Sequence, residues 1–402
     1  MKRILFVDDE IRVLDGIRRL LYHLRSEWRM SFVSSGPQAL ELMSHDAFDV
    51  IVTDIRMPGM DGIELLARTR ELYPSVVRIV LSGQSDRDLT LKSALNAHQY
   101  LSKPCDAESL TATIARAVAL KGTFTDPSLQ ALVAGAGTLP SIPSVYVELM
   151  RQLEDVDCCA QDIADIIARD PAMTAKILQL ANSAFFGVRR RIASPKDAVL
   201  YLGLDTLKSL ALSVKVFSQF TARPQSRFSI DELARHTMLV GILARKIASV
   251  QGASRQDVED AFAAGLLHDI GKLVLVAAAP EKYEQAIEDA EKEGKTDRDA
   301  ERRIFGTTHA EVGTYLVWLW GLPDSVVEAV AYHHAPTVCP APRFSPLTAV
   351  HVANALAHET AGGCSPLVSA LDMAYLGDLN LAGHVPGWRT LIEQAAQELR
   401  AA

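Results

Sequence analysis

The stretch VIVTDIRMPGMDG, Val50–Gly62, decides how the first part of the chain folds. It begins with strand-forming residues that end at Asp54, and its loop then leads into an amphipathic run. This order predicts a buried parallel strand with the carboxylate of Asp54 at its carboxyl end, the edge where open α/β sheets bind ligands. An acid after an apolar run is more often a turn or helix cap, so the neighbouring strands decide between the two interpretations.

Three further strand-like segments have polar side chains at or near their carboxyl ends, which would lie at the same edge of the sheet. RILFVDD ends in Asp8 and Asp9, RIVLSG contains Ser82, and QYLSKP contains Lys103. Because the carboxyl ends of parallel strands meet at one edge, we expect these side chains to lie together with Asp54. Carboxylates suit a hard divalent cation such as Mg²⁺, and the lysine adds a positive charge for an anionic group.

Strand-like and helix-period segments alternate over residues 1–121, which predicts an α/β doubly wound parallel sheet with strand order 2-1-3-4-5. The expected strands are Arg3–Val7, Met30–Val33, Val50–Thr53, Arg78–Leu81 and Gln99–Leu101. A fourth helix is expected at Asp86–Leu95 and a fifth at Asp106–Leu120. Residues 122–138 lack apolar periodicity and contain Gly, Thr and Pro, so we expect a linker there.

Residues 1–121 resemble the receiver domain of two-component response regulators, which has a flavodoxin-like fold. The resemblance implies a phosphoacceptor role for Asp54, Mg²⁺ binding by Asp8, Asp9 and Asp54, phosphoryl contact by Lys103, and switch roles for Ser82 and Tyr100. The chemistry is coherent without the family, because a carboxylate can accept a phosphoryl group while Mg²⁺ and a lysine neutralise the transferred charge.

From Leu139 onward the strand pattern gives way to helical periodicity, which predicts an all-α domain over residues 139–360 and a helical extension over 361–402. The expected helices are Pro143–Glu154, Ile163–Ala168, Pro171–Asn182, Pro195–Val216, Asp231–Val250, Val258–His268, Pro280–Glu293, His309–Trp320, Ser325–His333, Leu347–Thr360 and Trp388–Leu399. Asp170 is expected to cap the helix that begins at Pro171.

The front half of this helical region resembles the HDOD output module, a relative of the HD hydrolases. The resemblance is carried by LPSIPSVYVELMRQLED, by IADIIARDPAMTAKILQLANSAFFG and by ASPKDAVLYLGLDTLKSLAL. HDOD modules are generally thought to have lost catalysis. The resemblance therefore implies an HD-like helical domain that acts by binding another protein.

Seven of the 11 histidines lie between positions 236 and 358. In AFAAGLLHDIGKLVL, His268 and Asp269 end an apolar helix that Gly271 is expected to break, so both side chains can reach one ion. Imidazole and carboxylate suit Fe, Mn or Zn, although a single histidine on an apolar helix is more often a hydrogen-bonded core residue. The order resembles the metal set of HD-type phosphohydrolases: His236, His268, Asp269, His309, His333, His334 and, where the final acid belongs, Asn354.

Two departures from the HD enzymes stand beside these matches, although Lys272 agrees with the active members. HVANALAH places Asn354 where they have an Asp, so a metal would lose an anionic ligand and bind more weakly. His351, one helical turn earlier, is an alternative ligand. HHAPTVCPAPRF follows the paired histidines without the GYP loop of the HD-GYP enzymes that cleave cyclic di-GMP.

The charge distribution argues against nucleic-acid binding. The chain has 41 Lys and Arg against 49 Asp and Glu. Residues 1–121 hold 16 basic and 16 acidic residues, so the excess of acidic residues lies in the helical region.

Five cysteines show neither a disulfide framework nor CxxC spacing, which favours a reducing cytoplasm. The start MKRILFVDDE has acids where a signal peptide is apolar, and no run approaches ~18 apolar residues, so neither export nor a membrane span is expected.

Two functions fit these patterns. The first is a response regulator that a cognate sensor histidine kinase phosphorylates and that signals through a non-catalytic HDOD domain to a downstream protein, with a homodimer plausible. The second is a metal-dependent HD-type phosphohydrolase that acts on a nucleotide or cyclic dinucleotide, with a metal-bound water as nucleophile and Lys272 contacting phosphate.

Overall fold

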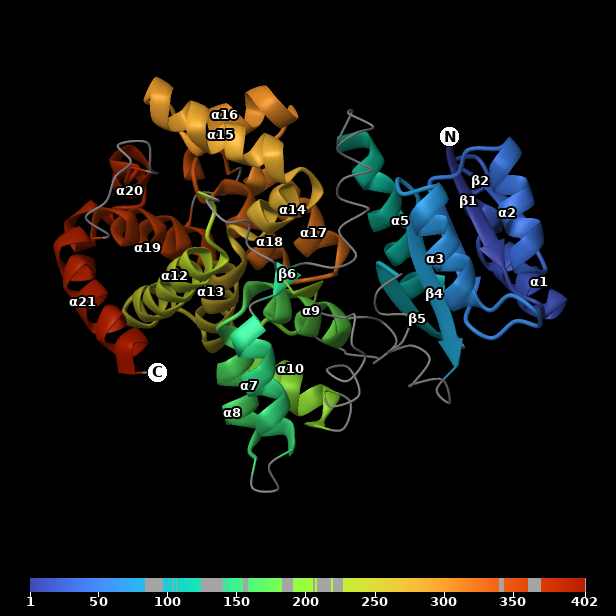
Figure 1. Cartoon of the computed structure of the whole chain (residues 1–402), viewed down its shortest axis with the longest axis horizontal. Coiled ribbons are helices and arrows are strands. Elements are labelled where there is room, and N and C mark those ends of the chain that lie inside the picture. Colours follow the sequence, from blue (N-terminus) through green and yellow to red (C-terminus); the bar gives the residue numbers. More distant parts are fainter. Residues whose placement is uncertain are drawn as a thin grey trace. The chain divides into compact units, whose positions relative to one another are not determined.

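The computed structural model describes residues 1–83, 97–103, 105, 107–123, 140–141, 143–154, 158–182, 191–204, 207, 218–219, 227–339, 343–360 and 370–401. Two compact units make up the chain. The first comprises Met1–Thr138, Leu180–Arg190 and Asp205–Val216, and the second comprises Leu139–Gln179, Arg191–Leu204 and Phe217–Ala402. Figure 1 shows a sheet flanked by helices in blue and teal, and an array of helices in green to red.

The first unit is built on a five-stranded parallel sheet in the order β2-β1-β3-β4-β5, which confirms the predicted order. Its strands are β1 (Lys2–Val7), β2 (Trp28–Val33), β3 (Val50–Asp54), β4 (Val77–Gly83) and β5 (Gln99–Lys103). Every residue of β3 is buried, as expected for a central strand covered on both faces. The sheet therefore carries Asp54 to its carboxyl edge.

The helices of this unit are α1 (Ile11–Leu20), the short η1 (Tyr22–Leu24), α2 (Gly36–His45), α3 (Gly62–Leu72) and α5 (Ala107–Thr123). Gly62 allows α3 to begin directly against β3, because a Cβ at this position would lie 2.0 Å from the carbonyl oxygen of Asp54. The expected fourth helix at Asp86–Leu95, the expected cap Asp106 and most of the expected linker lie outside the described residues.

Among its described residues, the second unit has helices and one short parallel strand pair, β6 (Pro140–Ser141) with β7 (Ser218–Gln219). Its helices are α7 (Pro143–Glu154), α8 (Ala160–Ala168), α9 (Pro171–Ala181), α10 (Pro195–Leu202), α12 (Ile230–Val250), α13 (Arg255–Leu267), α14 (Ile270–Ala278), α15 (Pro280–Glu293), α16 (Asp297–Phe305), α17 (His309–Leu319), α18 (Asp324–Tyr332), η5 (Pro336–Val338), α19 (Pro346–Thr360), α20 (Met373–Asp378), η6 (Ala382–His384) and α21 (Val385–Ala401). In its core, α12 packs against α13, α19 and α21, and α17 packs against α14 and α18.

Three expectations for this unit were wrong. The helix expected at Pro195–Val216 ends at Leu202, because Gly203 follows in a conformation with φ of +81°. None of α14, α16 and α20 was expected, nor was the β6–β7 pair. Gly271 does not break the apolar helix; the break falls at His268 and Asp269, and Gly271 lies inside α14.

Gly271 instead permits a close helix contact. A Cβ there would meet the carbonyl oxygen of His309 at 2.0 Å and the backbone nitrogen of Gly313 at 2.9 Å. The start of α14 therefore touches the backbone of the first turn of α17. This contact brings His309 close to Asp269.

The segment Arg255–Ala278 is long and apolar enough to cross a membrane by length and composition alone, although Asp269 and Lys272 interrupt its apolar residues. It is the single such run among the residues described. However, 83% of its most apolar window is buried within the protein, which is also typical of a core helix.

We expect Gly271→Ala to lower the free energy of unfolding of the helical unit by about 1–3 kcal/mol, because backbone atoms would have to move apart. Denaturant unfolding of the full chain, followed by helical circular dichroism, measures this change. Gly387→Ala in α21 is the matched control, since a Cβ there meets nothing within 4 Å. Equal stability of the two variants would contradict the close contact between α14 and α17.

Candidate phosphoacceptor and metal-binding sites

The acids predicted for the sheet edge of the first unit do lie together. Ligand oxygens of Asp8, Asp9 and Asp54 all lie within 4.8 Å of one another. Lys103 Nζ lies 2.6 Å from Asp8 Oδ2 and 2.7 Å from Asp54 Oδ1. Three carboxylates facing one ammonium leave negative charge that a divalent cation can neutralise, so the residues fit a Mg²⁺ site.

Burial and the lysine act against each other at this site. Burial raises the pKa of Asp54 above its ordinary value, although the hydrogen bond from Lys103 opposes the shift. Burial alone would lower the pKa of Lys103, but its hydrogen bonds to Asp54 and Asp8 raise that pKa. The lysine therefore stays charged between the two carboxylates.

The two predicted switch residues, Ser82 and Tyr100, are fully buried. In the sheet register, Asp54 pairs with Leu81, so Ser82 lies one position further toward the carboxyl edge. Tyr100 pairs with Val80 across β4 and β5. Ser82 thus lies on β4, the strand next to that of Asp54, and Tyr100 lies on β5, one strand further away. Their switch roles stay predictions.

In the helical unit, Asp269 lies at the junction of α13 and α14 with imidazoles around it. Its Oδ1 lies 3.2 Å from His309 Nε2 and 3.8 Å from His333 Nε2. Its Oδ2 lies 2.9 Å from Lys272 Nζ, 3.5 Å from His268 Nε2 and 4.0 Å from His236 Nε2. Two overlapping groups could each hold an ion: Asp269 with His309, His333 and His334, and Asp269 with His236 and His268.

Backbone carbonyls fix the orientation of two of these rings. His268 Nδ1 lies 2.8 Å from the oxygen of Gly265, and His333 Nδ1 lies 2.9 Å from that of Val330. Each Nδ1–H donates to its carbonyl, so each Nε2 carries a lone pair. Both Nε2 atoms and Asp269 Oδ1 are buried with no hydrogen-bond partner among the described residues. Oriented imidazoles and unpaired buried acceptors are the features expected of a metal site.

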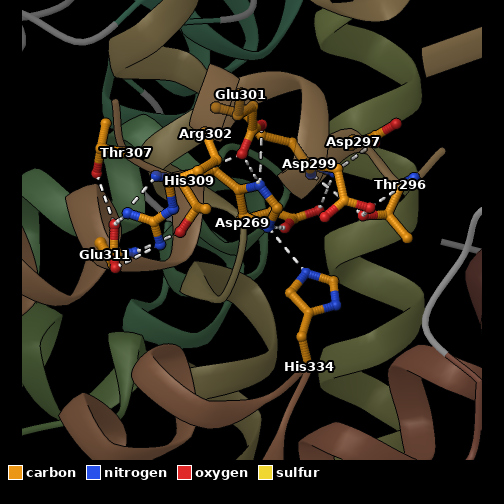
Figure 2. A network of polar contacts seen from close by, with 12 residues as sticks. Asp269, Thr296, Asp297, Asp299, Glu301, Arg302, Thr307, His309, Glu311 and His334 are labelled. Atoms are coloured by element: carbon orange, nitrogen blue, oxygen red, sulfur yellow. Dashed lines mark hydrogen bonds and ion pairs between the residues drawn. The ribbon is translucent and has the colours of Figure 1, made fainter. Parts of the chain in front are cut away.

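His309 is oriented by Glu301 of α16, a residue that the sequence analysis did not single out. The Nδ1 of His309 lies 2.9 and 2.7 Å from the two oxygens of Glu301, and its backbone nitrogen donates to Glu301 Oε2 at 2.8 Å. His309 Nε2 lies 2.9 Å from His334 Nε2 (Figure 2). Glu301 is 1% exposed although two arginines follow it, and a charged residue in so charged a segment gives no sign of its burial in the sequence.

Asn354 of α19 is buried beside His236, with its Oδ1 3.0 Å from His236 Nε2. His351 does not take the place of the missing acid. Its Nδ1 donates to the oxygen of His333 at 2.8 Å, and its Nε2 accepts from the backbone nitrogen of Asp372 at 3.0 Å. His358, which was not among the predicted ligands, lies against His236 with ring centroids 4.5 Å apart.

The electrostatics favour neutral rings around an ionised acid. Burial lowers the pKa of His236, His333 and His334 well below its ordinary value. Burial would raise the pKa of Asp269, but Lys272 beside it holds that pKa well below its usual range. Neutral imidazoles and an ionised carboxylate are the forms that bind metals.

Comparison with known proteins follows the same division of the chain. Residues 4–115 match the response regulator receiver domain, and residues 139–336 match the HDOD domain. The chain is a response regulator with an HDOD domain. The receiver contains the Asp54 site, and Asp269 with His236, His268, His309, His333 and His334 lies within the HDOD match.

Similar proteins match one or both parts of the receiver–HDOD chain. An uncharacterized protein of Treponema pallidum is 29% identical over 49% of this chain and 37% of its own length. The hydrogenase transcriptional regulatory protein HoxA of Cupriavidus necator is 39% identical over 30% of this chain and 24% of its own length. This chain thus matches less than half of either relative. The solved MmoQ response regulator of Methylococcus capsulatus is 25% identical over 61% of this chain and 94% of its own, with a TM-score of 0.47.

We expect Asp54→Asn to abolish labelling of the receiver by acetyl phosphate in the presence of Mg²⁺, because the amide cannot form the acyl phosphate. Phosphate-affinity electrophoresis of the full chain measures the labelled fraction. Asp61→Asn is the matched control, because Asp61 caps α3 through the backbone nitrogen of Glu64 and asparagine caps equally well. Wild-type labelling of Asp54→Asn would contradict the assignment.

Proposed function

We propose that the protein is a cytoplasmic, phosphorylation-controlled response regulator whose HDOD domain signals by binding a downstream protein rather than by catalysis. The position of Lys103 is the observation that best supports this proposal, because its ammonium bridges Asp8 and Asp54 at the carboxyl edge of the receiver sheet. That arrangement presents a carboxylate nucleophile next to a fixed positive charge. It fits phosphoryl transfer to Asp54.

The transfer is an in-line displacement at phosphorus. An oxygen of Asp54 attacks the phosphoryl group on a histidine of the cognate sensor kinase, the P–N bond breaks, and the imidazole leaves with its electron pair. Lys103 contacts the transferred group and balances its charge. Mg²⁺, held by Asp8, Asp9 and Asp54, would supply further neutralisation during transfer.

The proposed route to the output passes through β5 and α5. Phosphorylation draws Ser82 toward Asp54 and changes the packing of Tyr100, whose side chain is already buried before phosphorylation. This alters the face made by the fourth helix expected at Asp86–Leu95, which lies outside the described residues, the fifth strand and the fifth helix. Because α5 continues to Thr123, that face is covalently joined to the chain leading to the HDOD domain. We place a homodimer on the receiver face around the fourth helix expected at Asp86–Leu95, the fifth helix and the linker.

Two features of the HDOD domain support binding over catalysis. Asn354 replaces an anionic ligand with a neutral amide and engages His236 Nε2. The ammonium of Lys272 contacts Asp269 Oδ2 and stands 3.7 Å from Asp297, so it is engaged by protein carboxylates. A lysine held in this way does not present its charge to a substrate phosphate.

A metal-dependent phosphohydrolase is the second candidate, and the unpaired buried atoms around Asp269 favour it. Metal-loaded protein incubated with a panel of nucleotides and cyclic dinucleotides tests this candidate by product chromatography. Turnover that disappears in His333→Ala would establish hydrolysis. Loaded, folded protein with no turnover would leave the binding function as the better explanation.

We expect beryllofluoride with Mg²⁺, which mimics the phosphoryl group, to change hydrogen exchange in α5 and in the HDOD domain as well as at the receiver site. A shift of a balanced equilibrium to 10:1 requires about 1.4 kcal/mol, within the range of allosteric coupling. Exchange mass spectrometry of the full chain measures the change. Asp54→Asn, which should not respond, is the control, and changes confined to residues 1–121 would reject phosphorylation control of the output.

A further inference from the structure

The two oxygens of Asp269 face different partners, and this divides the histidine cluster into two sides. Oδ2 faces His236 and His268 together with Lys272, and Oδ1 faces His309 and His333. The carboxylate is 2% exposed, so neither oxygen is turned toward bulk solvent. The availability of each side to a cation can therefore be judged from its own contacts.

The side with His236 and His268 is closed to a cation. Lys272 Nζ, 2.9 Å from Oδ2, places a positive charge on the oxygen that this side would use. His236 Nε2 lies 3.0 Å from Asn354 Oδ1 and donates a hydrogen bond to it. If the amide of Asn354 were flipped, its NH₂ group would donate a hydrogen bond to the lone pair of His236 Nε2 instead. In both orientations His236 Nε2 is engaged. One imidazole, His268, then remains for an ion on this side.

The side with His309 and His333 is open. Glu301 holds the Nδ1–H of His309, and the carbonyl of Val330 holds that of His333, so both Nε2 atoms point inward. His309 Nε2 and His334 Nε2 are hydrogen-bonded to each other at 2.9 Å, and an ion bound by both rings would displace the proton between them. The Nε2 of His333 and Oδ1 of Asp269 have no hydrogen-bond partner in the described part of the chain. Ligand atoms of Asp269, His309, His333 and His334 all lie within 4.8 Å of one another.

We propose that the HDOD domain binds one transition-metal ion through Asp269, His309, His333 and His334, while Asn354 and Lys272 exclude an ion from the side of His236 and His268. Three imidazole nitrogens and one carboxylate oxygen select Zn²⁺, Fe²⁺ or Mn²⁺ over Ca²⁺ and Mg²⁺, which prefer oxygen. Metal–ligand bonds of about 2.0–2.1 Å in a tetrahedron place donors roughly 3.3 Å apart. The donor separations of 2.9, 3.2 and 3.8 Å bracket that value.

The ion would join elements that are distant in the sequence. His309 begins α17, His333 and His334 end α18, and Asp269 precedes α14. Glu301 would act as a positioning residue because it holds the ring of His309 without reaching the ion. This binding requires neither phosphorylation of the receiver nor hydrolysis of a substrate, so it goes beyond the proposed function and can fail separately from it.

Titration of chelator-treated full-length protein tests the proposal, with Zn²⁺ affinity and stoichiometry measured by calorimetry and Co²⁺ coordination measured by visible absorption. We expect one ion per chain and the intense absorption of four-coordinate Co²⁺. His334→Gln, at a partly exposed site, should weaken binding by at least the roughly 10–100-fold that loss of an outer-shell partner costs. His236→Gln, which is also partly exposed, is the matched control and should leave the affinity unchanged.

The number of ions bound per chain tests whether Asn354 and Lys272 exclude an ion from the side of His236 and His268. Replacing both excluding residues, in Asn354→Asp with Lys272→Met, should raise the binding from one ion to two. Absence of binding by the folded wild type would overturn the proposal, as would loss of the ion in His236→Gln with its retention in His334→Gln. A single ion in the double variant would overturn the role given to Asn354 and Lys272. Circular dichroism of each variant establishes that it is folded.

Discussion

The buried carboxylate of Asp269 is the group on which the helical unit depends. An ionised acid that is 2% exposed is tolerated only where opposite charge and hydrogen-bond donors surround it. Lys272, one turn further along α14, supplies the charge. The histidines lie on α12 and α17 and directly after α13 and α18. Compensating the buried charge of Asp269 therefore requires these separate helices to pack against one another.

The backbone around Asp269 is shaped by the same requirement. The helix breaks between α13 and α14, which lets His268 and Asp269 both face the cluster although adjacent side chains on a regular helix diverge by about 100°. Gly271 then lets α14 touch the backbone at His309, and a side chain there would push α17 away. Local geometry and electrostatics therefore agree at this junction.

The receiver could be predicted closely because its chemistry lies at strand ends, where alternation along the chain fixes both the fold and the position of Asp54, Asp8 and Lys103. The helical unit could be predicted less well. DRDAERRIF has six charged residues and only three apolar ones, Ala300, Ile304 and Phe305, so α16 and its buried Glu301 were missed. His351 was misread for a related reason. Helical spacing places it on a face of α19, but spacing does not show that the backbone of His333 and Asp372 occupies both its nitrogens.

The two charged sites of the chain differ in how much charge is left unbalanced, and this difference separates their chemistry. At the receiver edge, Lys103 faces both Asp8 and Asp54 while Asp9 stands nearby, so negative charge remains for a hard cation and then for a phosphoryl group. At the HDOD cluster, one lysine faces Asp269, and burial lowers the pKa of His236, His333 and His334 so that these rings are neutral. The remaining attraction there is that of nitrogen lone pairs, which suits a borderline metal better than a phosphate. The two sites therefore suit different ligands: the receiver edge suits a hard cation and a phosphoryl group, and the HDOD cluster suits a borderline metal ion.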